Sequence, residues 1–188
     1  MKKILIVGGV AGGATVAARL RRLDETANII MFERGEYISF ANCGLPYYIG
    51  QVITERDALL VQTVEGMSKR FNLDIRNFSE VTAIDPDKKE VTVKNVQTGQ
   101  EYKESYDELI LSPGANPVKP PIPGLADADN VFTLRNIPDT DAIKTFVDQK
   151  QPKEAVVIGG GFIGIEMAEN LVERGVKVHL VEMLDQVM

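Results

Sequence analysis

A glycine-rich turn framed by a strand, a helix, a second strand and an acid occurs twice in this chain. This repeat constrains the fold more than any other feature of the sequence. The first copy runs from the apolar residues 3–7 through the turn at 8–13 and a helix at about 14–23 to a strand at 28–32, which ends at Glu33. The second runs from 155–158 through the turn at 159–164 to a strand at 176–181, which ends at Glu182. Each copy predicts a parallel βαβ unit.

The chemistry of these turns follows from their backbone. Glycines let the main chain approach a pyrophosphate at the positive end of a helix, and the acid accepts hydrogen bonds from a ribose hydroxyl. The first turn departs from G-x-G-x-x-G, because Val10 holds the middle position beside Gly9. A glycine turn without a ligand is the alternative, and the complete βαβ context disfavours it. At the second turn Glu182 would repel a 2′-phosphate and no arginine follows it, which favours NADH over NADPH.

The segment between the two turns predicts further elements. Residues 52–72 have a helical pattern, with Met67 and Phe71 expected in the core. Lys69 and Arg70 are expected to be exposed, and a ligand-facing position is the alternative. Alternation over 80–84, 90–96 and 101–104 predicts an antiparallel meander, and 106–111 predicts a buried strand. A glycine follows that strand at position 114, where the main chain can approach a cofactor closely.

Together these elements predict the fold class and the domains. We expect an α/β fold: a Rossmann-like domain with a parallel sheet and an inserted antiparallel meander, then the first βαβ unit of a second Rossmann-like domain. The prolines of residues 116–124 indicate a stiff crossing. We place the first domain at 1–116, the connection at 117–150 and the start of the second domain at 151–188. One βαβ unit leaves a sheet face uncovered, so we expect the second domain to be truncated.

Composition narrows the class of partner. The net charge is −6 without a long run of one sign, which disfavours nucleic acid and anionic membranes. No apolar run approaches a membrane span of about 20 residues. The apolar start is too short for a signal peptide and ends in the glycine turn. One cysteine cannot form an internal disulfide, so we expect a cytoplasmic protein, and we predict no metal site.

The single cysteine, Cys43, stands in an unusual setting. A lone cysteine is ordinarily a buried packing residue. Here residues 44–50 read as the first turns of a helix that starts near Cys43. The dipole of such a helix stabilises a thiolate, which is the nucleophile that attacks disulfides. Ser39 and Asn42 can donate hydrogen bonds to the sulfur or to a substrate.

The helix after the first turn carries two stripes. Thr15, Arg19 and Arg22 form a polar stripe, and an apolar stripe of Val16, Leu20 and Leu23 is expected to face the sheet. From the residues alone, a solvated surface is the favoured interpretation of the arginines, and an anion site is the alternative. The only histidine, His179, is interpreted as a structural strand residue.

Two dinucleotide signatures with such a cysteine between them resemble the pyridine nucleotide–disulfide oxidoreductase family over the whole chain. Common members carry C-x4-C, whereas this chain has S-F-x-x-C-G-L-P-Y-Y-x-G. That pattern resembles the single-cysteine branch of coenzyme A–disulfide reductases, persulfide reductases, NADH oxidases and NADH peroxidases, and S-F-A-N-C is especially similar to the first of these. The oxidases and peroxidases carry a histidine where this chain has Ala11, so oxygen or peroxide reduction is disfavoured.

The resemblance implies an FAD-dependent NAD(P)H:disulfide oxidoreductase. Its catalytic, redox-active centre would be Cys43, cycling as a mixed disulfide with coenzyme A. The implied FAD-binding residues are Gly8, Gly9, Ala11, Gly12, Gly13, Glu33, Arg34, Val81, Ser112 and Gly114. Those implied for NADH, with NADPH possible, are Gly159, Gly161, Phe162, Ile163, Gly164, Glu166 and Glu182. Those implied for coenzyme A are Thr15, Arg19, Arg22, Ser39 and Asn42, which reverses the interpretation of the arginines.

Family members also have a later segment that completes the FAD site and a dimerisation domain. We therefore expect a homodimer at full length. We expect this chain alone to turn over little or not at all, and to hold FAD weakly or not at all. Three alternatives remain open: an NADH-dependent coenzyme A persulfide or polysulfide reductase, an NADH oxidase, and a non-catalytic flavin-binding electron carrier.

Overall fold

A computed structural model describes residues 2–188, and its contacts divide them into two compact units. The first contains the residues up to Phe40 together with Leu60–Ala115, and the second contains Ala41–Leu59 and Asn116–Met188. Ala41–Leu59, which the sequence analysis includes in the first domain, joins the second unit because helix α2 (Leu45–Ile49) packs on α4 (Ile137–Lys150) and α5 (Phe162–Glu173).

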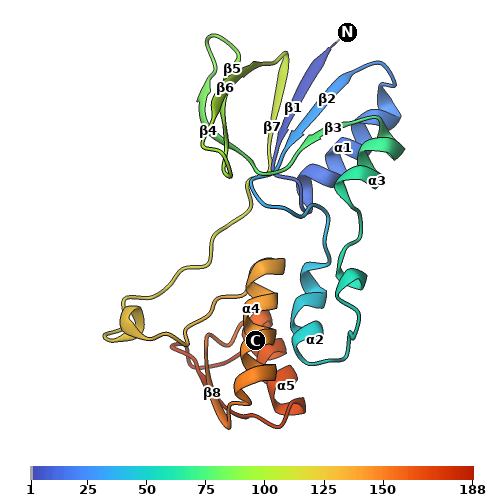
Figure 1. Ribbon diagram of the computed structural model, residues 1–188. Helices are drawn as coiled ribbons and strands as arrows, with labels where there is room; N and C mark the ends of the chain where they lie inside the picture. The colour runs from blue at the N-terminus through green and yellow to red at the C-terminus, as the bar shows by residue number, and fades with distance from the viewer. Residues whose placement is uncertain (1) are drawn as a thin grey trace. The chain divides into compact units, whose positions relative to one another are not determined.

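The first unit is built on a four-stranded parallel sheet with the order β3-β2-β1-β7 (Figure 1). The strands are β1 (Lys3–Val7), β2 (Asn28–Phe32), β3 (Asp74–Arg76) and β7 (Glu108–Leu111). Leu5 pairs in register with Ile30 on one side and with Leu109 on the other. Ile4, Leu5 and Ile6 of β1 are buried because both faces of this sheet are covered, as the apolar run at 3–7 predicts.

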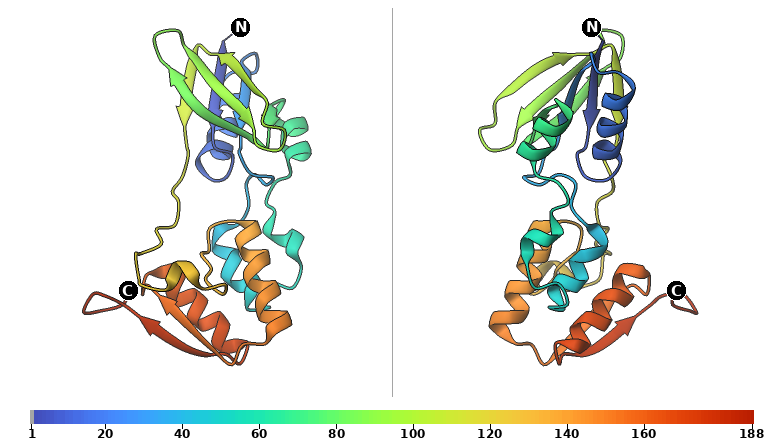
Figure 2. Two further views of the ribbon diagram at one scale, coloured as in Figure 1. Left: turned by 60° about the vertical axis from the view of Figure 1, so that its left-hand side comes forward. Right: turned by 90° about the vertical axis from the view of Figure 1, so that its right-hand side faces the viewer.

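Each face of this sheet has its own covering layer. Helices α1 (Gly12–Leu23) and α3 (Val64–Phe71) cover one face, and the antiparallel strands β4 (Ser79–Asp85), β5 (Glu90–Asn95) and β6 (Glu101–Ser105) cover the other (Figure 2). Ile4 and Ile6 pack with α1 and α3, whereas Leu5 packs with Val91 and Val93 of β5. The α/β fold and the inserted meander are therefore confirmed.

The sheet-facing side of α1 differs from the prediction. Its buried residues are Gly13, Ala14 and Ala17, whereas Leu23 is 67% exposed. Val16 and Leu20 are half-buried at the margin of the core. The prediction is confirmed for Val16 and Leu20, which pack against the core, and wrong for Leu23. It missed the small residues because it followed side-chain size, whereas Gly13 brings the helix close to the strands.

The predicted helical segment at 52–72 also forms only in part. A short 3-10 turn covers Arg56–Leu59, and the regular helix α3 begins at Val64. Thr63 starts this helix, since its hydroxyl oxygen accepts a hydrogen bond of 3.0 Å from the Gly66 N–H. Asn72, with a φ of +47°, ends it. Met67 is buried as predicted and Phe71 is half-buried.

The second unit packs three helices against each other and against a two-stranded parallel sheet. The sheet consists of β8 (Glu154–Ile158) and β9 (Lys177–Val181), joined by α5. A 3-10 turn at Asn42–Gly44 precedes α2, and another lies at Leu125–Asp127. The core contains Ile49, Ile143, Val147, Met167, Leu171 and Val176. Val156 and Ile158 of β8 are 64% and 51% exposed, so one face of this small sheet is bare within residues 2–188.

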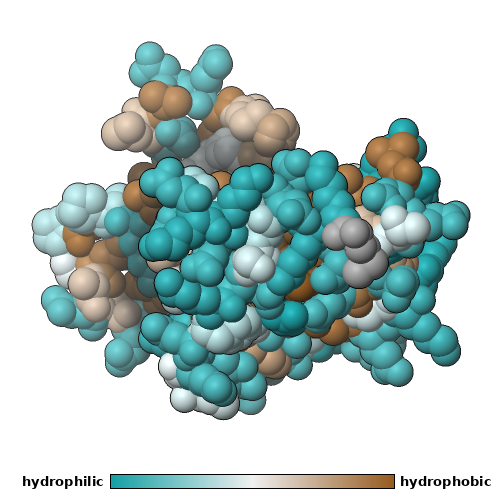
Figure 3. Space-filling model, turned by 90° about the horizontal axis from the view of Figure 1, so that it is seen from above, coloured by the Kyte–Doolittle hydropathy of each residue, from teal (hydrophilic) through white to brown (hydrophobic). Residues whose placement is uncertain are grey.

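The surface around the N-terminus is mostly hydrophilic, with scattered hydrophobic residues (Figure 3). Within residues 2–188, no helix has the length and apolar character needed to cross a bilayer.

Candidate dinucleotide turns, cysteine and anion pocket

The first glycine turn brings segments of main chain together at the end of β1. Gly8 has a φ of +94°, and a Cβ added there would lie 2.1 Å from the carbonyl oxygen of Ser112, which follows β7. A Cβ at Gly13 would lie 1.7 Å from the carbonyl oxygen of Gly8. No side chain caps α1 at Ala11, so the first N–H groups of this helix are available to an anion. Close backbone approach and an uncapped helix start fit a pyrophosphate.

Glu33 ties this turn to the end of β2. One carboxylate oxygen accepts a hydrogen bond of 2.8 Å from the Gly9 N–H, and the other accepts one of 2.8 Å from the Gly35 N–H. The Gly9 carbonyl in turn accepts a bond of 3.0 Å from the Ser39 N–H. A carboxylate has further lone pairs, so a ribose hydroxyl can still donate to Glu33. The acid thus holds the turn in place, a role that the sequence pattern did not indicate.

The second glycine turn has the same internal geometry. Gly159 has a φ of +107°, and a Cβ at Gly164 would lie 1.9 Å from the Gly159 carbonyl oxygen. Helix α5 begins after Gly161 without a side-chain cap. Phe162 and Ile163, in its first turn, are 70% and 57% exposed. The second turn therefore offers an anion the same uncapped helix start as the first.

Glu182 holds the second turn as Glu33 holds the first. One oxygen accepts a hydrogen bond of 2.6 Å from the Gly160 N–H, and the other accepts bonds of 2.7 Å and 2.9 Å from the N–H groups of Met183 and Leu184. The backbone donors at Leu184, Gly160 and Met183 lower the pKa of Glu182 below its ordinary value. Glu182 is therefore a carboxylate at neutral pH.

Cys43, the single cysteine of the chain, lies in the 3-10 turn that leads into α2. Its side chain is exposed, so it is not the buried packing residue that a lone cysteine ordinarily is. Asn42 is exposed in the same turn. The helix that the sequence predicts near Cys43 is present as this turn followed by α2. An exposed thiol can be reached by a small-molecule disulfide.

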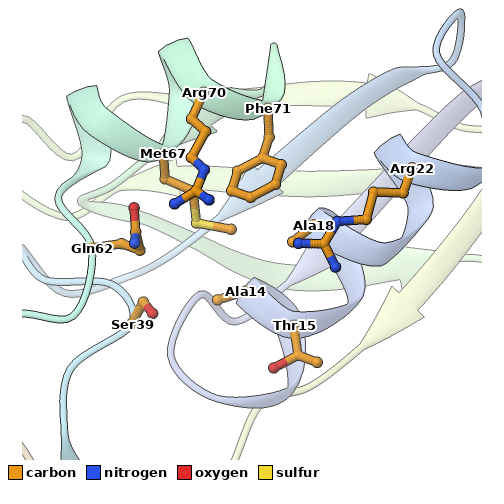
Figure 4. A pocket seen from close by; sticks show the side chains of 9 residues that line it. All are labelled: Ala14, Thr15, Ala18, Arg22, Ser39, Gln62, Met67, Arg70 and Phe71. Atoms are coloured by element: carbon orange, nitrogen blue, oxygen red, sulfur yellow. The ribbon is translucent and has the colours of Figure 1, made fainter.

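Helices α1 and α3 of the first unit flank an open pocket of about 210 Å³ (Figure 4). Its lining residues are Ala14, Thr15, Ala18, Arg22, Ser39, Gln62, Met67, Arg70 and Phe71. The guanidinium carbons of Arg22 and Arg70 lie 5.9 Å and 5.2 Å from the centre of the Phe71 ring. Figure 4 shows both guanidinium groups turned toward the space between the helices. Neither arginine forms an ion pair within residues 2–188, so the pocket has unneutralised positive charge.

The pocket brings together some of the residues that the sequence analysis proposed for coenzyme A. Thr15, Arg22 and Ser39 line it, whereas Arg19 is exposed on α1 outside the lining and Asn42 belongs to the other unit. Sequence reasoning missed Gln62 and Phe71 as lining residues and held a ligand-facing Arg70 only as the alternative to an exposed one. The closeness of Arg70 to the core residue Met67 along α3 was the available signal, since a residue three positions from a buried one lies near the same helix face.

Of the other residues predicted to bind the cofactors, some lie at the glycine turns and some form contacts elsewhere. Ser112 packs over the first turn, with its hydroxyl oxygen 3.1 Å from a Cβ built at Gly12, and Gly114 follows with a φ of +67°. Arg34 is exposed and pairs with Glu80 at 3.8 Å, and Val81 lies half-buried in β4. On α5, the main-chain carbonyl of Glu166 accepts a hydrogen bond of 2.8 Å from Asn170. No group of three or more His, Cys, Asp or Glu side chains within residues 2–188 is arranged to hold a metal ion.

Comparison with known proteins gives a match to one family. Residues 2–188 match the family described as pyridine nucleotide-disulphide oxidoreductase. A coenzyme A disulfide reductase of Staphylococcus haemolyticus is 46% identical over 187 residues, which cover 100% of this chain. The chain spans 42% of the length of that curated relative.

Solved structures agree with this match. A structure described as reduced Bacillus anthracis CoADR-RHD is 68% identical with a TM-score of 0.98, and the match covers 100% of this chain and 34% of that one. An NAD-dependent persulfide reductase from A. fulgidus is 37% identical with a TM-score of 0.92, covering 98% of this chain and 34% of that one. Both similarities include the two glycine turns and the cysteine segment, because they extend over almost the whole chain.

Proposed function

Because the chain belongs to the pyridine nucleotide-disulphide oxidoreductase family, we propose that it contributes to an FAD-dependent NAD(P)H:disulfide oxidoreductase that reduces coenzyme A disulfide through Cys43. One observation carries the proposal: the single cysteine is exposed at the turn before α2, in a chain with two dinucleotide turns of the same internal geometry. The similarity to a coenzyme A disulfide reductase supports the choice of substrate.

The two turns divide the cofactors between them. FAD would be held by the first turn, Glu33 and the main chain around Ser112, and NADH by the second turn and Glu182. When bound, FAD supplies the means of passing the two electrons of a hydride from NADH to a disulfide bond. The chain itself contributes the glycine backbones, the uncapped helix starts and the two carboxylates. The carboxylate of Glu182 would repel the 2′-phosphate of NADPH, which supports NADH as the donor.

The pocket between α1 and α3 would hold the anionic end of coenzyme A. Arg22 and Arg70 carry positive charge without carboxylate partners in residues 2–188, and phosphate groups are the natural ligands of paired guanidinium groups. The Phe71 ring between them offers an aromatic face. Thr15 and Ser39 add hydroxyl groups to the lining.

The chemistry at Cys43 is thiol–disulfide exchange. The thiolate attacks one sulfur of coenzyme A disulfide, a bond forms between Cys43 and that sulfur, and one coenzyme A thiolate leaves. Two electrons then break the mixed disulfide, restoring the Cys43 thiolate and releasing the second coenzyme A. NADH supplies both electrons, and each coenzyme A thiolate takes up a proton. The net reaction consumes one disulfide, one NADH and one proton, and gives two thiols and NAD⁺.

Replacing Cys43 by serine in the full-length protein tests this assignment. We expect NADH to reduce the bound flavin at its normal rate, because the turns are untouched, while turnover of coenzyme A disulfide is lost. Stopped-flow flavin absorbance and thiol release measure the two steps. Disulfide turnover that survives Cys43→Ser would reject the proposed function in favour of an electron carrier.

A coenzyme A persulfide reductase is the second candidate, supported by the similarity to the NAD-dependent persulfide reductase. Such a substrate would use the same thiol and the same pocket. Steady-state kinetics with coenzyme A disulfide, coenzyme A persulfide and oxygen separate the candidates. We expect oxygen to be the poorest of the three, because the first turn carries Ala11 and offers no acid–base side chain at that position.

A further inference from the structure

The helix that follows Cys43 is too short to fix its own position. Helix α2 has five residues, and no side chain caps either α2 or the 3-10 turn before it. Cys43 itself is exposed. By contrast, Leu45, Pro46, Tyr48 and Ile49 are buried. The location of the thiol therefore depends on what holds α2 from its buried side and from its far end.

At that far end, a single arginine links three helices. Arg174, which follows α5, donates a hydrogen bond of 2.8 Å to the carbonyl oxygen of Ile49, the last residue of α2. Its other terminal nitrogen donates a bond of 2.5 Å to Asp148 of α4. The Arg174 side chain is 15% exposed and its bond to Ile49 is partly buried, whereas its bond to Asp148, which is 37% exposed, lies at the surface. A guanidinium group at the C-terminal end of a helix is also electrostatically favourable.

Asp148 and Lys144 complete this contact from α4. The second oxygen of Asp148 accepts a hydrogen bond of 2.9 Å from Lys144, whose ammonium group lies 5.2 Å from the centre of the Tyr48 ring in α2. Partial burial opposes ionisation of Asp148, but the hydrogen bonds from Lys144 and Arg174 outweigh it and lower its pKa. The carboxylate is thus charged at neutral pH and keeps both cations in place.

Gly50, the residue after α2, packs directly against α5. A Cβ at Gly50 would lie 2.0 Å from the side-chain oxygen of Asn170, so only glycine fits there. Asn170 is 2% exposed and is fixed by its bond to the Glu166 carbonyl. Figure 1 shows α2 beside α4 and α5. The end of α2 thus has a close fit on the helix that begins at the second glycine turn.

We propose that Arg174 is a positioning residue for Cys43: by binding the Ile49 carbonyl and Asp148 together, it holds α2 so that the thiol meets the substrate disulfide. The proposal rests on the proposed function of Cys43. Arg174 is distant in sequence from the thiol and contacts neither substrate nor cofactor in this role. It therefore affects thiol–disulfide exchange and leaves the capture of NADH unchanged.

The test compares Arg174→Ala, Arg174→Lys and Lys177→Ala in the full-length protein. Lys177, at the start of β9, is a matched control because, within residues 2–188, its only ion pair is an exposed one with Glu154. For Arg174→Ala we expect a kcat for coenzyme A disulfide about 10- to 100-fold lower, the loss typical of a group displaced by about 1 Å. Flavin reduction by NADH should stay within about twofold of wild type. Arg174→Lys should fall between wild type and alanine, because the ammonium group reaches one partner at most.

Alkylation of Cys43 by iodoacetamide gives a readout that does not require turnover. We expect its rate to change severalfold in Arg174→Ala and to be normal in Lys177→Ala. Equal losses of flavin reduction and disulfide turnover, or an unchanged turnover, would overturn the proposal. If Arg174→Ala fails to fold, Arg174→Lys is the test. A lower disulfide turnover with normal flavin reduction supports the proposal, and the absence of such a selective loss overturns it. Should the wild-type protein not reduce the disulfide, the proposed function fails, and the alkylation rates still decide the positioning role.

Discussion

The two glycine turns have the same internal geometry, but different segments of the chain surround them. In each, a Cβ at the last glycine would strike the carbonyl oxygen of the first, at 1.7 Å for Gly13 and 1.9 Å for Gly164. In each, an acid accepts the N–H of the residue after the first glycine. At Gly8, however, a Cβ would also lie 2.1 Å from the Ser112 carbonyl, whereas nothing within residues 2–188 lies within 4 Å of a Cβ at Gly159.

This difference comes from the number of neighbouring strands. Strand β1 lies between β2 and β7, and the chain leaving β7 crosses over the first turn. Strand β8 pairs only with β9 among the described residues, so no neighbouring strand brings main chain against Gly159. The chain after β9 reaches the next glycine instead, because the Met188 N–H donates a hydrogen bond of 3.1 Å to the Gly160 carbonyl. The motif itself therefore sets the fit of helix on strand, and a third strand sets how firmly the turn is enclosed.

The largest expected effects test the shared geometry. Gly13→Ala and Gly164→Ala should each lower the free energy of unfolding by about 3 kcal/mol, because the added methyl group meets main-chain oxygen that cannot move aside. Denaturant unfolding measures both changes. Gly161→Ala is the matched control, since no atom of residues 2–188 beyond its chain neighbours lies within 4 Å of its added Cβ and its φ is −78°; it should cost less than about 0.5 kcal/mol. A tolerated Gly164→Ala would show that the two turns are not equivalent.

The next effect tests the difference between the surroundings. Gly8→Ala should cost about 3 kcal/mol, because it combines a positive φ with the contact to Ser112. Gly159→Ala has only the positive φ to oppose it and should cost about 1 kcal/mol. The comparison is again made by denaturant unfolding. Equal costs would mean that the crossing of the chain after β7 does not distinguish the turns.

A third difference lies in the charges of the two helices that leave the turns. Helix α1 carries Arg19, Arg21 and Arg22, and helix α5 carries Glu166, Glu169 and Glu173. Only the first helix thus offers a partner for a second anion. Arg22→Ala and Arg70→Ala should each raise the KM for coenzyme A disulfide about tenfold, the loss of one charge-assisted contact, and leave the KM for NADH unchanged. Lys69→Ala, an exposed neighbour on α3 outside the pocket, should change neither value. A parallel rise in the KM for NADH would contradict the separation of the two sites.

The sequence predicts the local elements of both turns, but not how the first helix packs on its sheet. Strands, turns and acids follow from local patterns, so β1, β2, β8 and β9 begin and end close to their predicted residues. The burial of α1 did not follow, because Leu23 is apolar and yet exposed, while Ala14 and Ala17 face the strands. That outcome depends on how close the helix lies to the sheet, which the glycine at position 13 sets.

The residues of the candidate site were likewise predictable only in part. The family resemblance implied Thr15, Arg22 and Ser39, since the polar stripe alone favoured a solvated surface. Arg70 and Phe71 come from α3, more than thirty residues further along the chain. Helical spacing alone cannot show that α3 lies beside α1. The link between Arg174 and Ile49 was likewise absent from any local pattern, because it joins residues 125 positions apart.

The smallest expected effect concerns protonation at the second turn. Backbone donors at Leu184, Gly160 and Met183 lower the pKa of Glu182 below 4.5, so the carboxylate stabilises this turn above that pH and loses its contribution as pH falls through the lowered value. The amide signal of Gly160 in NMR spectra should therefore move with a midpoint below pH 4.5, and Glu182→Gln should abolish the movement. A midpoint above 4.5 would mean that these hydrogen bonds do not favour the charged form. Because the Glu182 hydrogen bonds in question join only the second turn and the residues just after β9, acidification should loosen that turn locally and leave the paired strands of the first unit folded.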